Sequence, residues 1–169
     1  AIYRGKMPRH EAEERIARYW EPYHARLQIL LDAARMRHGQ TVLIDCHSMP
    51  HEAMDGVARA GLRRPDVVLG DRFGAAASGD VVDRIEAAFS AAGFIVTRNA
   101  PFAGAYITQA YGRPAKGQHA VQVEIDRSLY MNEQLIRPNG DFDIVRAALR
   151  GVVKEIAQIG QGRIPLAAE

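Results

Sequence analysis

The chain has 169 residues and a mass of 18.7 kDa, the size of one domain, and its 47% hydrophobic content excludes a disordered tail or a fibrous repeat. Lys and Arg (22) nearly balance Asp and Glu (20), and only 7% of residues are aromatic, so no nucleic-acid partner is expected. No apolar run approaches the ~20 residues that a membrane span needs, so no membrane partner is expected either.

The first third of the chain is predicted to form a long helix followed by a strand. Gly39 ends the predicted helix, and the apolar run 41–46 that follows has strand length. Such a continuous apolar strand is usually covered on both faces. From about 8 to 38, apolar residues recur at spacings of three and four, the helical period: Ile16, Tyr19, Trp20, Tyr23, Leu27, Leu30 and Leu31.

The remaining elements alternate between strands and helices. Residues 64–70 and 94–97 are predicted strands, and 80–92 is a predicted helix. The segment 99–117 is rich in Gly and Pro and is predicted to be irregular and functional. Residues 120–126 alternate strictly, which predicts a strand with one polar face, and 142–159 has helical spacing. This order indicates a single domain over 1–169 with a three-layer α/β/α sandwich.

A histidine stands at the carboxyl end of the first predicted strand. Ligands bind at that edge of open α/β sheets, so the imidazole of His47 is placed to face a site. Asp45 shares its strand face and is suited to orient the imidazole. Because Asp-x-His is a short and common pattern, the alternative is a strand-end histidine with a satisfied hydrogen bond.

A glutamate stands on the polar face of the 120–126 strand. The carboxylate of Glu124, projecting into a cleft beside a metal-bound water, would suit a general base. The alternative is a solvent-facing glutamate on an antiparallel or edge strand. Neither residue identifies a function by itself.

Four stretches in this order resemble the N-formylglutamate amidohydrolase family: 43–50 (LIDCHSMP), 66–74 (DVVLGDRFG), 104–114 (GAYITQAYGRP) and 122–131 (QVEIDRSLYM). The resemblance runs from about 15 to 156. It implies a zinc-dependent amide hydrolase related to zinc carboxypeptidases and aspartoacylase, with a phosphorylase/hydrolase-like fold around a mixed sheet. It also implies that His47 is a zinc ligand and that Glu124 activates the zinc-bound water as general base.

The implied reaction hydrolyses the formamide bond of N-formyl-L-glutamate, or of a related N-acyl amino acid, to formate and the amino acid, a step of histidine degradation in the cytoplasm. Arg72 and Arg113 follow predicted elements in glycine-bounded loops, where a guanidinium can clamp a substrate carboxylate. Tyr106 and Tyr130 could donate hydroxyl hydrogen bonds to the substrate. The alternatives are exposed, solubilising arginines and tyrosines that pack by their rings.

The family's first pair of zinc ligands has no counterpart in this sequence. His10 and Glu13 have ligand-like spacing but fit a solvated helix start better. We therefore expect the chain to be the C-terminal portion of a longer catalytic domain, with an exposed first strand and no stoichiometric zinc or activity when alone. The alternative is a non-catalytic relative that binds a ligand or partner on the same scaffold. The oligomeric state is left open.

Three further residues are expected to be structural. His51 and His119 have no partner evident in the sequence and are predicted to be loop histidines. Cys46 should face away from Asp45 and His47 as a small buried hydrophobe. As the single cysteine it excludes an intrachain disulfide and fits a reducing compartment.

Overall fold

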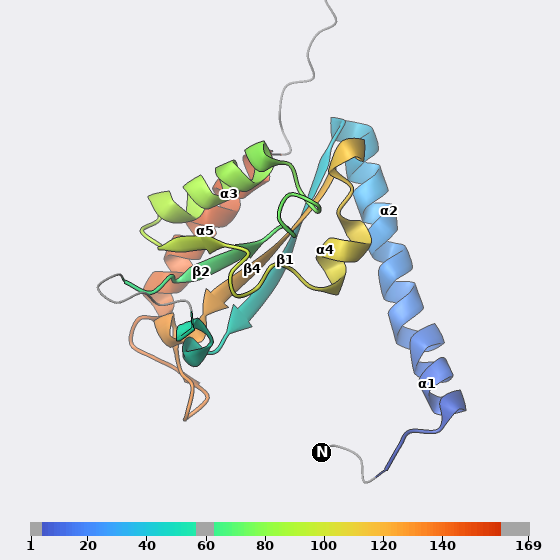
Figure 1. Ribbon diagram of the computed structural model, residues 1–169, viewed down its shortest axis with the longest axis horizontal. Helices are drawn as coiled ribbons and strands as arrows, with labels where there is room; N and C mark the ends of the chain where they lie inside the picture. The colour runs from blue at the N-terminus through green and yellow to red at the C-terminus, as the bar shows by residue number, and fades with distance from the viewer. Residues whose placement is uncertain (1–4, 57–62, 160–169) are drawn as a thin grey trace, which may run out of the picture.

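A computed structural model describes residues 5–56 and 63–159 of the chain. It has a four-stranded sheet with helices on both faces, the predicted three-layer arrangement (Figure 1). The helices are α1 (Arg9–Arg15), α2 (Glu21–His38), α3 (Gly79–Ala91), α4 (Tyr106–Tyr111) and α5 (Phe142–Ile159). The strands are β1 (Thr41–Met49), β2 (Val67–Gly70), β3 (Val96–Arg98) and β4 (Gln118–Asp126), with a separate hairpin of β5 (Met131–Asn132) and β6 (Arg137–Pro138).

The sheet is mixed, with strand order β1-β4-β2-β3. β1 is parallel to β4, β2 is antiparallel to β4, and β3 is parallel to β2. The β1–β4 ladder pairs Asp45 with Gln122 and His47 with Glu124. Within the described residues β1 has a neighbour on one side only, so it is an edge strand there.

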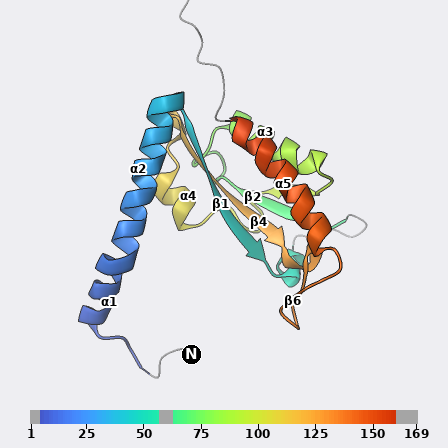
Figure 2. The ribbon, with the colours of Figure 1, turned by 180° about the vertical axis from the view of Figure 1, so that it is seen from behind.

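The two faces of the sheet are covered by different helices. α3 and α5 pack together on one face, against apolar residues of β1, β2 and β4, and this is the main core. α2 and α4 lie on the other face (Figures 1 and 2). There Leu31 and Tyr111 form a smaller core with Leu43 and Ala120. The two cores therefore cover both faces of β1 and β4: Ile44 and Val121 face the main core, and Leu43 and Ala120 face the smaller one.

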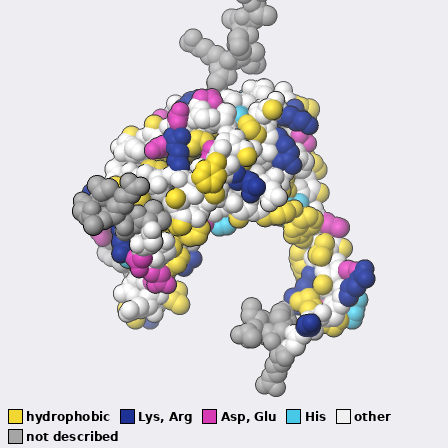
Figure 3. Space-filling model, viewed as in Figure 1, with side chains coloured by type: hydrophobic (Ala, Val, Ile, Leu, Met, Phe, Trp, Pro, Cys, Tyr) yellow, Lys and Arg dark blue, Asp and Glu magenta, His cyan; other side chains and the backbone are white. Residues whose placement is uncertain are grey.

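α1 and α2 are joined by a π-helical turn (Ile16–Trp20) into one long helix, as predicted. Gly39 ends it in a left-handed conformation (φ 78°). The predicted apolar stripe is largely exposed, because the amino-terminal half stands away from the body as an arm (Figures 1 and 3). No described helix is both long and apolar enough to cross a bilayer. The exposed stripe residues are Ile16, Tyr19, Trp20, Tyr23 and Leu30.

The segment 99–117 is not irregular throughout, and that prediction is wrong. Its glycines and prolines flank a six-residue stretch that forms α4, and a 3-10 turn (Pro114–Lys116) follows. α4 forms because Ile107 and Tyr111 reach the smaller core. The breaker-rich composition therefore marks the ends of a short helix, and the chain before it becomes the loop 102–105.

Candidate active site

His47 and Glu124 lie side by side at the carboxyl ends of β1 and β4. They are direct partners in the parallel ladder, so their side chains leave the same face of the sheet. Nδ1 of His47 lies 3.7 Å from Oε1 of Glu124. The glutamate side chain is 9% exposed and the histidine side chain 42%. The structure therefore brings together a solvent-accessible imidazole and a largely buried carboxylate, and the solvent-facing alternative for Glu124 is excluded.

Asp45 supplies a second carboxylate to the same imidazole. Its Oδ2 lies 3.0 Å from Nε2 of His47, at an angle that does not make a hydrogen bond. This oxygen is buried and has no hydrogen-bond partner among the described residues. A carboxylate beside one ring nitrogen is the usual companion of a histidine whose other nitrogen binds a metal.

Gln122 completes the polar row, and it was not among the site residues predicted from the sequence. Its Nε2 donates to Glu124 Oε1 at 2.8 Å, and its Oε1 accepts from the backbone N–H of Ala105 at 2.8 Å. The strict alternation of residues 120–126 in the sequence already placed residues 122 and 124 on one face of the strand, so their proximity could have been predicted. The burial of that polar face was not visible from the alternation alone.

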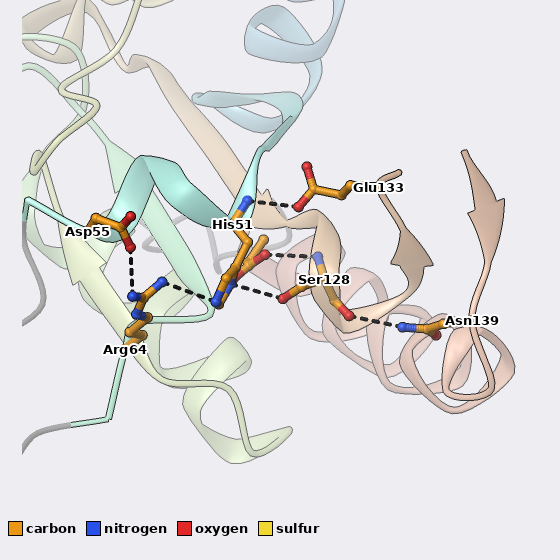
Figure 4. Close-up of polar contacts among 7 residues, drawn as sticks. His51, Asp55, Arg64, Ser128, Glu133 and Asn139 are labelled. Carbon is orange, nitrogen blue, oxygen red and sulfur yellow. Dashed lines mark hydrogen bonds and ion pairs between the residues drawn. The ribbon is translucent and has the colours of Figure 1, made fainter. Parts of the chain in front are cut away.

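A second polar cluster lies a few residues further along both strands (Figure 4). His51 Nδ1 lies 2.7 Å from Oδ2 of buried Asp126 and 3.1 Å from Ser128 Oγ, while Nε2 faces Arg64 Nη1 at 3.0 Å. Nucleophilic catalysis needs the serine and the carboxylate on opposite ring nitrogens. Here both lie on Nδ1, so the cluster ties the 3-10 turn after β1 to the end of β4. His51 therefore has a partner in the structure that no spacing in the sequence shows.

A groove of about 700 Å³ opens beside His47. Its other walls come from Ile125, Tyr130 and α5. Three cations on α5 also line the groove; they were not predicted as site residues, although they recur every four residues along the predicted helix. They are Arg146, Arg150 and Lys154.

The residues predicted to bind the substrate make their contacts away from the His47–Glu124 pair. The Arg113 guanidinium donates to the backbone oxygens of Gln109 and Gly112. Arg72 is half-buried in the turn after β2, where its backbone N–H donates to Ala103 O. The Tyr106 ring packs with rings on the helical arm, and the ring of Tyr130 lines the groove with His47. Among the described residues, Arg72, Arg113 and Tyr106 make no hydrogen bond, ion pair or ring contact with His47.

The side chains around His47 could supply part of a metal site. A catalytic zinc takes about three protein ligands. The described residues contain no group of three or more His, Cys, Asp or Glu arranged to hold an ion. His47 with its orphaned Asp45 oxygen has the chemistry of one ligand and its orienting carboxylate. At the helix start, Glu13 instead pairs with Arg9 on an exposed surface.

The other two residues expected to be structural differ in their environment. His119 lies on β4 and is buried, so its prediction as a loop histidine is wrong; its Nδ1 accepts from the backbone N–H of Ser78 at 3.2 Å. Burial lowers the pKa of His119 below 6.5, partly offset by the charge of Asp80. Cys46 is exposed, so its prediction as a buried residue is wrong, because the edge position of β1 leaves this end of the strand uncovered among the described residues.

The fold and the site define the class: a three-layer α/β/α protein on a mixed sheet, with a histidine and carboxylates where two parallel strands end. Residues 1–131 match the family model described as N-formylglutamate amidohydrolase, and the chain belongs to that family.

Two curated relatives are named N-formylglutamate deformylase. The Pseudomonas aeruginosa protein is 35% identical over 166 residues, covering 93% of this chain and 58% of the relative. The Pseudomonas putida protein is 36% identical over 135 residues, covering 76% and 48%. The chain therefore spans about half the length of the curated relatives it matches.

Two solved structures are also similar to this chain. The crystal structure of N-formylglutamate amidohydrolase from Ralstonia eutropha JMP134 has a TM-score of 0.80 and 33% identity, covering 95% of this chain and 56% of that chain. Gene product Atu2144 from Agrobacterium tumefaciens has a TM-score of 0.54 over 91% of this chain and 57% of that chain. At 20% identity the second structure supports the fold alone.

Proposed function

We propose that the chain is the C-terminal portion of a catalytic domain that hydrolyses the formamide bond of N-formyl-L-glutamate, or of a close N-acyl amino acid. The observation that carries the proposal is the largely buried Glu124 carboxylate 3.7 Å from the His47 imidazole. The printed names of the Pseudomonas relatives supply the substrate. We place the reaction in the cytoplasm, on the composition and the single cysteine.

We propose zinc as the cofactor, held by one ring nitrogen of His47, with Asp45 orienting the ring from the other. When bound, zinc polarises the formyl oxygen and makes its bound water more acidic. The remaining ligands would come from outside the described residues, since these hold no group of three donors.

Glu124 does the proton work in this proposal. Its carboxylate takes a proton from the attacking water as the water oxygen bonds to the formyl carbon. It then gives that proton to the leaving nitrogen as the C–N bond breaks, which yields formate and the free amino group. A positioned general base of this kind contributes about 10²–10⁴-fold in rate.

Cations are needed for the two carboxylates of the substrate. We keep Arg72 and Arg113 as candidates, with Tyr106 as a hydroxyl donor. Arg150 on α5 is a weaker competitor: it lines the groove that His47 also lines, but α5 covers the face of the sheet opposite to the one from which Glu124 projects. The KM for N-formyl-L-glutamate separates them: replacing by alanine the residue that clamps a carboxylate raises KM, and replacing an uninvolved arginine leaves it unchanged.

The test is formate release from N-formyl-L-glutamate by the full product of the gene, with the 169-residue chain measured in parallel. We expect formate and glutamate in equal amounts, bound zinc, and loss of turnover with a chelator. Tight binding of N-formyl-L-glutamate without turnover or metal would instead support the non-catalytic alternative. It would overturn the proposed reaction.

A further inference from the structure

We infer that Gln122 is a positioning residue that fixes the orientation of the Glu124 carboxylate, and that the loop 102–105 fixes Gln122 in turn. The inference deepens the proposed function, because it rests on Glu124 as the general base. Neither Gln122 nor the loop 102–105 is proposed as a metal ligand. Its basis is a continuous chain of contacts from the loop to the carboxylate.

Gln122 bridges a side chain and a backbone group inside the protein. Its exposed fraction is 4%. The amide nitrogen donates to Glu124 Oε1 at 2.8 Å, and the amide oxygen accepts from Ala105 N at 2.8 Å. Both ends of the amide are therefore engaged, which restrains the last torsion of this side chain.

The backbone group decides which way the amide points. The N–H of Ala105 can only donate, so it must meet the oxygen of Gln122. The NH₂ group of Gln122 is then turned toward Glu124, whatever the conformation of the carboxylate.

The loop 102–105 packs directly on the sheet at Gly70, which has no side chain to keep it away. Gly70 on β2 is the ladder partner of Gln122. A Cβ added at Gly70 would lie 2.6 Å from the backbone N of Gly104 and 2.8 Å from the carbonyl carbon of Ala103. The close approach fixes the loop on β2, directly before Ala105. The N–H that holds Gln122 is therefore positioned by the sheet itself.

Two substitutions at Gln122 distinguish its hydrogen bond to Ala105 from its hydrogen bond to Glu124. Gln122→Glu keeps an acceptor for Ala105 N and loses the donor to Glu124, whereas Gln122→Met loses both. If the chain of contacts positions the base, both variants lower kcat, by about 10–100-fold, with KM for N-formyl-L-glutamate nearly unchanged. Gln122→Glu also sets a second carboxylate beside Glu124, so Gln122→Met decides between the two roles. A purely structural role predicts that Gln122→Met loses no more kcat than an equally buried glutamine-to-methionine change elsewhere on β4.

Gln118→Met is the matched control. Gln118 is buried on the same strand and face, and its Nε2 donates to the backbone oxygen of Tyr111 at 2.7 Å. It lies six residues from Glu124, about 20 Å at ~3.3 Å per residue. We expect this variant to lose similar stability and to keep its kcat. An equal loss of kcat in Gln118→Met would overturn the inference.

Nuclear magnetic resonance gives a readout that needs no activity. In the ¹⁵N-labelled wild-type protein, we expect slow hydrogen exchange at the Gln122 side-chain amide, and faster exchange in Glu124→Ala. An amide that exchanges like free glutamine overturns the inference even in an active enzyme. A protected amide in a protein that releases no formate overturns the proposed function and leaves the contact chain intact.

Discussion

Nδ1 of His47 lies 3.7 Å from Oε1 of Glu124 because the two residues are partners in the parallel β1–β4 ladder. Backbone hydrogen bonds of two nine-residue strands hold both Cα atoms, and the alternation of strands turns both side chains to one face. A pair built on strands is held more precisely than one built on loops. This pair is therefore the fixed part of the candidate site.

Asp45→Asn should raise the stability of the metal-free protein and lower its affinity for zinc. Among the described residues the buried Asp45 oxygen has no hydrogen-bond partner, and a buried carboxylate costs more free energy than a neutral amide. The metal-free variant should therefore gain about 1 kcal/mol in free energy of unfolding at pH 8. Zinc affinity should fall about 10–100-fold, because the carboxylate no longer orients His47. Denaturant unfolding and zinc titration against a competing chelator measure the two effects.

Asp32→Asn is the control for that prediction, since Asp32 makes an exposed ion pair on α2. It should change neither quantity appreciably. An Asp45→Asn variant that is less stable and binds zinc normally would show that Asp45 is a structural residue.

Gly70→Ala should destabilise the protein by about 1–3 kcal/mol, because the new Cβ overlaps the backbone of the loop 102–105. Gly151→Ala in α5 is the matched change: its Cβ would meet nothing within 4 Å, so it should stabilise by about 0.5–1 kcal/mol. Urea unfolding measures both variants. Equal effects at the two glycines would contradict the close approach at Gly70.

The sequence predicted most of the fold because its strands and helices have strong periodicity. The long helix, β4 and α5 follow from apolar spacing, and α5 occupies the predicted residues 142–159. α4 was missed because six residues between glycines show no complete helical period. The exposure of the helical arm was also not predictable, since spacing reports an apolar face and says nothing about what covers it.

The site was predicted in part for similar reasons. His47 and Glu124 were identified as a pair through the resemblance, and their ladder partnership explains why both lie together. Gln122 and the bond between His51 and Asp126 were missed, because they depend on which strands pair and at what register. Sequence patterns give the face of a strand but not its partner.

The stability of the protein should fall as the pH drops below about 6.5, with His119 as one cause. A histidine whose pKa is lowered by burial binds fewer protons folded than unfolded, so its contribution is present above the unfolded pKa and is lost as the pH falls. Its Nδ1 must also stay unprotonated to accept from Ser78. Free energies of unfolding from about pH 5 to 7 should show a shallower slope in His119→Gln. Equal slopes would contradict the assignment.

Leu31→Ala should cost about 2–5 kcal/mol, because Leu31 is 5% exposed in the smaller core. Leu30→Ala, at a side chain 52% exposed on the same helix, should cost no more than about 0.5 kcal/mol. Thermal or urea unfolding of the two variants makes the comparison. A Leu30→Ala variant as unstable as Leu31→Ala would show that the outer face of the arm is covered in solution.

The most direct test of the account is the kcat of Glu124→Gln for formate release from N-formyl-L-glutamate, compared with wild type at equal zinc content. The amide keeps the shape of the side chain and loses its basicity, and Gln122 can still approach it. The account predicts that kcat falls by about 10²–10⁴-fold while zinc stays bound. A kcat close to that of the wild type would contradict the assignment of Glu124 as the general base.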